Sequence, residues 1–162
     1  QNTNLLLAFL RDHNTARSVL DVFNDLYAMF GRETYCRLFP VILTDRGSEF
    51  SNPVPIEQDE NDELRSLVFY CNPGAPYQKG GIEVAHELVR RVLPKGKSFD
   101  DLQQEDIDLM LSHINSYKRG KLNSRSAYQL FNFIYGDDIL PKLNIREIEA
   151  NDIVLSPKLL KK

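Results

Sequence analysis

The chain has 162 residues, of which 42% are hydrophobic, 27% charged and 10% aromatic. This composition is typical of one globular domain and excludes disordered and fibrous proteins. Twenty Lys and Arg residues stand against 23 Asp and Glu residues, so the formal net charge of −3 argues mildly against a nucleic-acid-binding protein. Only two cysteines, Cys36 and Cys71, and three histidines are present, and their spacing argues against a structural zinc site.

No apolar run approaches the roughly 20 residues of a membrane-spanning helix, and no signal peptide is recognised. Together with the two unpaired-looking cysteines, this leads us to expect a protein of a reducing cytoplasm with no membrane partner. The numbering opens at Gln1 and not at Met, so we expect the chain to be part of a longer protein.

The charges are unevenly distributed along the chain. The segment Glu57–Glu63 holds five of the acidic residues, and without it the net charge would be +2. Basic residues gather in three places: Lys79, Arg90, Arg91, Lys95 and Lys97; Lys118, Arg119, Lys121 and Arg125; and Lys158, Lys161 and Lys162. Such clusters indicate either phosphate contacts or ordinary solvated surface charge.

The first half of the chain predicts two strands and a helix. The apolar run Leu5–Leu10 predicts a strand buried on both faces. Asn14 or Thr15 can cap a helix with apolar residues at three-and-four spacing, which Gly31 is placed to end. Val41–Thr44 is a short β-branched strand that delivers Asp45 to a loop.

The second half predicts a strand and three helices. The acidic segment Glu57–Glu63 is expected to be a surface loop, Ser66–Cys71 a strand, and Asn72–Pro76 a turn. A helix over Lys79–Leu93 would bury one stripe and expose another, and Pro94 would end it. The exposed stripe holds Glu83, Glu87 and Arg90, and the buried one holds Ile82, Ala85, Val89 and Val92.

Two further helices follow. Ser98–Asp101 has the spacing of a capping box, and it is expected to open a helix that buries Ile107 and Ile114. Ala127–Tyr135 is a shorter helix that ends at Gly136. The order of elements predicts one α/β layer domain over residues 1–136, with a peripheral extension over 137–162.

Two carboxylates are candidates for chemistry. Asp45 follows a buried strand, and ligands of α/β sheets bind at the carboxyl ends of strands. Glu83 stands 38 positions later, near the start of the amphipathic helix. Each also has a plain explanation, since Asp before Gly is common in turns and acids are favoured in a first helical turn. If both converge, a hard cation such as Mg²⁺ would relieve their repulsion.

These motifs resemble the integrase-core transposases of bacterial insertion sequences, and more narrowly the branch of those elements numbered thirty. The resemblance runs over Leu5–Leu10, Leu43–Phe50, His86 with Arg90–Gly96, Ile114–Tyr117, Ser126–Phe131 and Asn151–Leu155. It implies a ribonuclease-H-like fold shared with retroviral integrases. It also implies a polynucleotidyl transferase of the DDE type, in which Asp, Asp and Glu hold two Mg²⁺ or Mn²⁺ ions for cleavage and strand transfer.

The resemblance assigns Asp45 as the second Asp and Glu83 as the Glu, both as metal ligands. It begins at the third strand of the fold, so the catalytic core is expected to lack its first strands and its first Asp, and the isolated chain to be inactive. Arg46 stands where Asn is common, and Ile82 and Val84 flank Glu83 where Asn is usual.

The expected partners are DNA, as transposon ends and target, and further copies of the protein in a homo-oligomer. The residues predicted to contact the DNA backbone are Arg46, Lys79, His86, Arg90, Arg91 and Lys95. Two alternatives stay open. The chain is a non-catalytic DNA-binding or assembly module derived from a transposase, or it is a nuclease of the same fold that cuts without joining ends.

Overall fold

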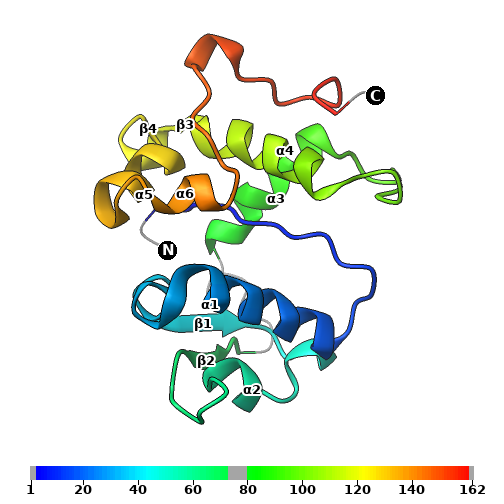
Figure 1. The fold of residues 1–162 in the computed structure, drawn as a ribbon. Coiled ribbons are helices and arrows are strands. Elements are labelled where there is room, and N and C mark those ends of the chain that lie inside the picture. Colours follow the sequence, from blue (N-terminus) through cyan, green and yellow to red (C-terminus); the bar gives the residue numbers. More distant parts are fainter. Residues whose placement is uncertain (1–2, 73–79, 161–162) are drawn as a thin grey trace. The chain divides into compact units, whose positions relative to one another are not determined.

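The computed structural model describes residues 3–72 and 80–160. Contacts divide the chain into two compact units (Figure 1). Unit 2 is the continuous stretch Arg11–Lys79, whereas unit 1 combines Gln1–Leu10 with Gly80–Lys162. Each unit has its own core, and they are described in turn.

Unit 2 is built on α1, Ala16–Leu38. Its N-cap is Thr15, one of the two predicted candidates, and the Thr15 hydroxyl accepts the backbone N–H of Ser18 at 3.1 Å. The predicted end at Gly31 is wrong, because the helix kinks there and continues for a further seven residues. Tyr35 holds this second part in place, since its ring is fully buried between those of Tyr27 and Phe39 at 5.2 and 5.1 Å.

The sheet of unit 2 has two parallel strands, β1 (Val41–Thr44) and β2 (Leu67–Tyr70). Both strands were predicted, with β2 one residue shorter at each end. Their register pairs Val41 with Leu67 and Thr44 with Tyr70, so the carboxyl ends of both strands lie at the same edge of the sheet. The crossover between them contains the 3₁₀ turn η1 (Ser48–Phe50) and the short helix α2 (Val54–Glu57).

The acidic segment is only partly the expected surface loop. Glu57 closes α2, and its carboxylate accepts the backbone N–H of Val68 at 2.8 Å. The Asp59 side chain is 4% exposed and accepts hydrogen bonds from the Tyr27 hydroxyl at 2.7 Å and from Arg32 at 2.8 Å. These contacts hold the pKa of Asp59 below its usual range, with the Tyr27 hydrogen bond as the largest cause. Two of the five acids are therefore part of the fold.

Unit 1 is mainly helical. Its helices are α3 (Gly80–Val92), α4 (Gln104–Ser116), α5 (Ala127–Tyr135) and α6 (Ile139–Lys142). A small antiparallel pair, β3 (Lys118–Arg119) and β4 (Arg125–Ser126), encloses the 3₁₀ turn η3 (Gly120–Leu122), and a further turn, η4, spans Ala150–Asp152. The predicted helix 127–135 is confirmed, with Gly136 at its C-cap.

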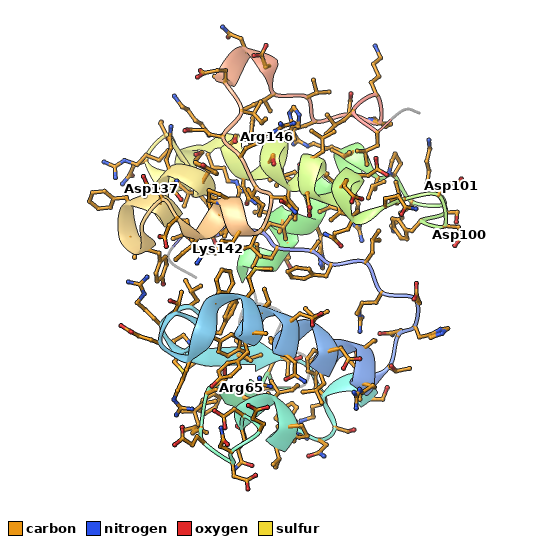
Figure 2. All side chains as sticks on the ribbon, viewed as in Figure 1. Arg65, Asp100, Asp101, Asp137, Lys142 and Arg146 are labelled. Carbon is orange, nitrogen blue, oxygen red and sulfur yellow. The ribbon has the colours of Figure 1, made fainter. Side chains whose placement is uncertain are left out.

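The predicted start of α4 at Ser98–Asp101 is wrong. Ser98 accepts the backbone N–H of Asp100 at 3.1 Å and so closes a local turn, and Asp100 and Asp101 lie in the loop before the helix (Figure 2). The helix begins at Gln104 because Gln103 and Asp106 form their own capping box. Residues 111–116 of α4 are then buried without interruption, so α4 runs through the centre of unit 1.

The run Leu5–Leu10 is not the predicted strand. No strand lies beside it among the described residues, and side chains of α4 take the place of one. The Asn115 amide accepts the Leu6 N–H and donates to the Leu6 carbonyl, both at 2.8 Å. Gln104 likewise accepts the Leu10 N–H at 2.9 Å and donates to the Ala8 carbonyl at 3.2 Å. The segment satisfies its backbone on a helix face instead of a sheet.

The residues after Gly136 are not peripheral. Ile139, Leu140 and Ile145 are at most 1% exposed in the core of unit 1. Polar side chains of α4 bind the backbone that follows: Ser112 accepts the N–H of Arg146, Ser116 that of Ile148 and His113 that of Val154. The chain is thus a mixed α/β protein with two small sheets, and the expected single layered sheet is not found in the described residues. None of the described helices is long and apolar enough to span a membrane.

Candidate functional site

Asp45 lies where the sequence placed it, directly after β1 at the carboxyl edge of the parallel pair. It is exposed, and its carboxylate accepts the backbone N–H of Gly47 at 3.4 Å. The loop beyond is fixed to the neighbouring strand, because the Tyr70 hydroxyl donates to the Phe50 carbonyl. The strand end therefore presents a carboxylate to solvent on an anchored loop.

Arg46 is also exposed in this loop. It follows Asp45 directly in the sequence, so a permanently charged side chain stands next to the candidate carboxylate along the chain. A guanidinium there is suited to a phosphate oxygen, which Arg can bind with two parallel hydrogen bonds.

Glu83 lies in the first turn of α3 and is exposed. His86, Glu87 and Arg90 are exposed on the same helix, while Leu88 and Val92 are 3% and 2% exposed. The predicted charged face of α3 is therefore confirmed. Of the predicted buried stripe Val92 is buried, Ala85 and Val89 are half-buried, and the side chain of Ile82 lies outside the described residues. Leu88 was not among the predicted buried residues.

The end of α3 is basic. Arg91 is paired with Glu87, one turn earlier, at 2.6 Å, and both side chains are about half exposed or more. Lys95 is exposed just beyond the helix. The predicted contact residue Lys79, the beginning of the predicted helix at Lys79 and most of the predicted turn Asn72–Pro76 lie outside the described residues.

Asp45 belongs to unit 2 and Glu83 to unit 1. Among residues 3–72 and 80–160, no group of three His, Cys, Asp or Glu side chains gathers as a metal site. The two carboxylates supply the hard oxygen donors that Mg²⁺ prefers. Their assignment as metal ligands remains a prediction from the sequence.

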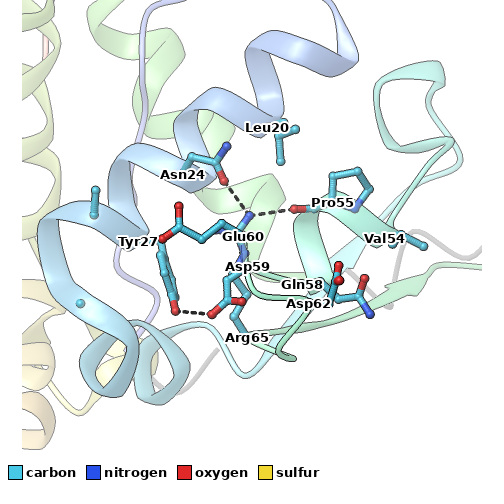
Figure 3. Close-up of a pocket in the computed structure, with 12 residues that line it drawn as sticks. Leu20, Asn24, Tyr27, Val54, Pro55, Gln58, Asp59, Glu60, Asp62 and Arg65 are labelled. Atoms are coloured by element: carbon cyan, nitrogen blue, oxygen red, sulfur yellow. Dashed lines mark hydrogen bonds between the residues drawn. The ribbon is translucent and has the colours of Figure 1, made fainter.

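A pocket of unit 2 lies between α1 and the acidic segment and measures about 790 Å³ (Figure 3). The buried Arg65 forms part of its lining and donates to Asn24 and to the Pro55 carbonyl, both at 2.8 Å. Asp59, Glu60 and Asp62 add three carboxylates to the wall. This excess of negative charge would repel the phosphates of DNA.

A smaller pocket of about 330 Å³ lies wholly in unit 1. Its lining is basic, aromatic and apolar: Arg91, Tyr117, Lys118, Ala150, Ile153 and Leu155. Of these, only Arg91 was predicted as a site residue. The sequence offers one signal for this pocket, which is an aromatic residue, Tyr117, directly before the basic cluster that begins at Lys118.

Comparisons with known proteins give three informative relatives. The ORF3 protein of Spiroplasma virus SpV1-R8A2 B, an integrase by name, is 31% identical over 120 residues, which are 74% of this chain and 35% of that protein. The transposase for IS1086 of Cupriavidus metallidurans is 35% identical over 63 residues, 39% of this chain and 19% of the relative. Transposase InsI for IS30A of Escherichia coli is 27% identical over 63 residues, 39% of this chain and 16% of the relative.

The chain thus spans about a third of the length of the first relative and a fifth or less of the other two. No family model matches the sequence. No solved structure matches the fold. The sequence relatives are nonetheless all named as integrases or transposases, and they include the transposase of an element of the branch numbered thirty. The chain is therefore related to the family of integrases and insertion-sequence transposases that its motifs indicated.

Proposed function

We propose that this chain is part of an enzyme that cuts and joins DNA during transposition or integration. The similarity to proteins named as integrase and transposases carries the proposal. The exposed carboxylate at the carboxyl end of β1 supports it, because such strand ends are where α/β sheets bind their ligands. On this proposal residues 1–136 are part of a ribonuclease-H-like catalytic core, and 137–162 extend it.

Asp45 and Glu83 are the proposed ligands of Mg²⁺ or Mn²⁺, with a further Asp supplied from outside this chain. When bound, two such ions activate the attacking oxygen and stabilise the leaving oxygen of a phosphodiester. The role of the two side chains is to offer their carboxylate oxygens to the ions, and both side chains are exposed.

DNA would be held by its backbone. Arg46, His86, Arg90, Arg91 and Lys95 are all exposed, and Lys79 is proposed with them from the sequence. Contacts of this kind bind phosphate without reading bases and weaken steeply with salt. The protein is proposed to act on transposon ends and target DNA as a homo-oligomer.

The test is calorimetric titration of Mg²⁺ and Mn²⁺ into the complete natural protein that carries this chain and into the chain itself. We expect the complete protein to bind metal, and Asp45→Asn and Glu83→Gln each to abolish that binding together with strand transfer of pre-cleaved ends. The isolated chain, with two of three carboxylates, is expected not to bind.

Matched controls are Asp12→Asn and Glu105→Gln. Asp12 is an exposed loop carboxylate, and Glu105 occupies the first turn of α4 as Glu83 does that of α3. Both variants should bind metal as the unaltered protein does. Failure of the complete protein to bind metal would overturn the catalytic proposal and leave a DNA-binding or assembly module. Cleavage without strand transfer would identify a nuclease instead.

A further inference from the structure

The pocket of unit 1 is assembled from three parts of the chain. Arg91 comes from the last turn of α3, and Tyr117 and Lys118 follow directly on α4. Ala150, Ile153 and Leu155 come from η4 and the extended residues after it. The lining therefore combines two cations and a tyrosine with an aliphatic wall that comes from η4 and the residues after it.

The aliphatic wall is fixed to the centre of the unit. Val154, between the two lining residues Ile153 and Leu155, donates its N–H to Nδ1 of His113 at 3.1 Å. His113 lies in α4 and is 7% exposed. Since Tyr117 is the C-cap of the same helix, α4 holds both the aromatic side and the aliphatic side of the pocket.

The polar side chains of the pocket are accessible to solvent. Tyr117 is 38% exposed, and Arg91 and Lys118 are exposed. Arg91 gives one N–H group to Glu87, but a guanidinium has five, and an exposed pair one helical turn apart is worth little. The Glu87 carboxylate and then Tyr117 raise the pKa of Arg91, so this cation is present at every working pH.

We propose that this pocket takes one nucleotide of unpaired DNA, its base against the Tyr117 ring and its phosphate on Arg91 and Lys118. The inference rests on the proposed function and extends it, because it specifies that the pocket binds unpaired DNA and not duplex DNA. An aromatic ring beside cations is the arrangement that binds single strands, since every base can stack and every nucleotide carries a phosphate. The volume of about 330 Å³ lies in the range of small-ligand pockets, which begins at roughly 300 Å³.

The chain contains no tryptophan, so Tyr117→Trp introduces a single reporter into the pocket. Its fluorescence would be followed while a thymidine oligonucleotide, an abasic oligonucleotide of equal length, a thymidine mononucleotide or inorganic phosphate is added. We expect quenching by the thymidine oligonucleotide at concentrations where the other three give little.

Affinities of the other variants would be measured by fluorescence anisotropy with a labelled oligonucleotide. Tyr117→Ala should weaken binding of the unpaired oligonucleotide about fivefold or more, whereas Tyr117→Phe should retain it. Arg91→Gln and Lys118→Gln should each weaken binding and lower its salt dependence. Lys142→Gln removes a positive charge from α6, outside the pocket lining, and should change neither.

Equal affinity for abasic and thymidine oligonucleotides, or an unchanged affinity in Tyr117→Ala, would overturn the inference. Binding of the mononucleotide as tight as that of the oligonucleotide would assign the pocket to free nucleotides and overturn it too. If duplex DNA binds and the pocket variants have no effect, this inference alone fails. If neither duplex nor unpaired DNA binds, the proposed function fails with it.

Discussion

Gly31 allows α1 to kink without ending. Its backbone angles are φ 71° and ψ 164°, a region that is essentially restricted to glycine. A Cβ at this position would meet nothing within 4 Å, so the constraint is on the backbone and not on space. The residue is needed because Tyr35, beyond the kink, packs back onto Tyr27, which lies before it.

Gly31→Ala is expected to lower the free energy of unfolding by about 1–3 kcal/mol, the usual strain of such a backbone. Urea unfolding followed by circular dichroism measures it. Gly120→Ala is the matched control, because Gly120 also has an open Cβ position but no positive φ. A loss no larger than that of the control would contradict the account of the kink.

At this scale the sequence predicted individual residues well where a local rule acts. Thr15 as an N-cap follows from helix chemistry, and so does the exposed face of α3 that carries Glu83. Asn115 could not be predicted in the same way. This fully buried Asn is explained by its hydrogen bonds to the backbone of Leu6, which lies 109 residues earlier in the sequence. Tyr117 was missed because its pocket is closed by residues from η4.

Side chains of α4 form the hydrogen bonds with the backbone of Leu5–Leu10 that a neighbouring strand would otherwise form. Asn115→Ala would remove both partners of the Leu6 backbone, and each buried group left unsatisfied costs about 1–3 kcal/mol. We expect the free energy of unfolding to fall by about 2 kcal/mol or more. Limited proteolysis should also cut within Leu5–Leu10 sooner.

Asn151→Ala is the control for this change, because Asn151 is exposed in η4. It should leave both the unfolding curve and the cleavage pattern as they are. If Asn115→Ala behaves in the same way, the segment is held by its apolar side chains alone.

Helices and strands were predictable where the residues within them determine the secondary structure. β1, β2 and α5 depend on short apolar runs and on a capping Ser126, and all were found near their expected bounds. The apolar run Leu5–Leu10 was misassigned because periodicity cannot say what will satisfy the backbone. The end of α1 was misassigned because glycine permits a kink as readily as a stop.

Across the whole molecule the charge is divided between the units. Unit 2 has seven basic and eleven acidic residues, whereas unit 1 has thirteen and twelve. The net charges of −4 on unit 2 and +1 on unit 1 agree with the proposal that most of the DNA-backbone contacts, those of His86, Arg90, Arg91 and Lys95, come from unit 1. Neither the division into units nor the burial of Ile139, Leu140 and Ile145 in the core of unit 1 could be predicted, because both depend on contacts between residues far apart in the sequence.

The two units should also respond to acid at different pH. Burial and Arg146 lower the pKa of His113 in unit 1 from its ordinary value of 6.5, although Asp152 opposes the shift. The stabilisation by neutral His113 is therefore complete above about pH 6.5 and lost as the pH falls through its lowered pKa. The pKa of Asp59 in unit 2 is lowered from 3.8, so its contribution is complete above that value and lost only below it.

Amide hydrogen exchange between pH 7 and pH 4, corrected for intrinsic rates, is expected to show α4 losing protection before α1. The variant His113→Gln keeps an acceptor for the Val154 N–H but does not titrate, so it should remove the early loss in unit 1. Simultaneous loss in both helices of the unaltered protein would contradict a separate response.

The order of the units along the chain has a consequence for synthesis. Unit 2 is continuous and can fold once Lys79 has left the ribosome, but the first ten residues belong to unit 1 and must wait for α4. Until Asn115 emerges, the backbone of Leu6 lacks the side-chain partner that it has in this structure, which leaves the apolar run Leu5–Leu10 more open to chaperones and to other nascent chains. The same helix that completes the core thus sets how long the growing polypeptide is exposed to aggregation.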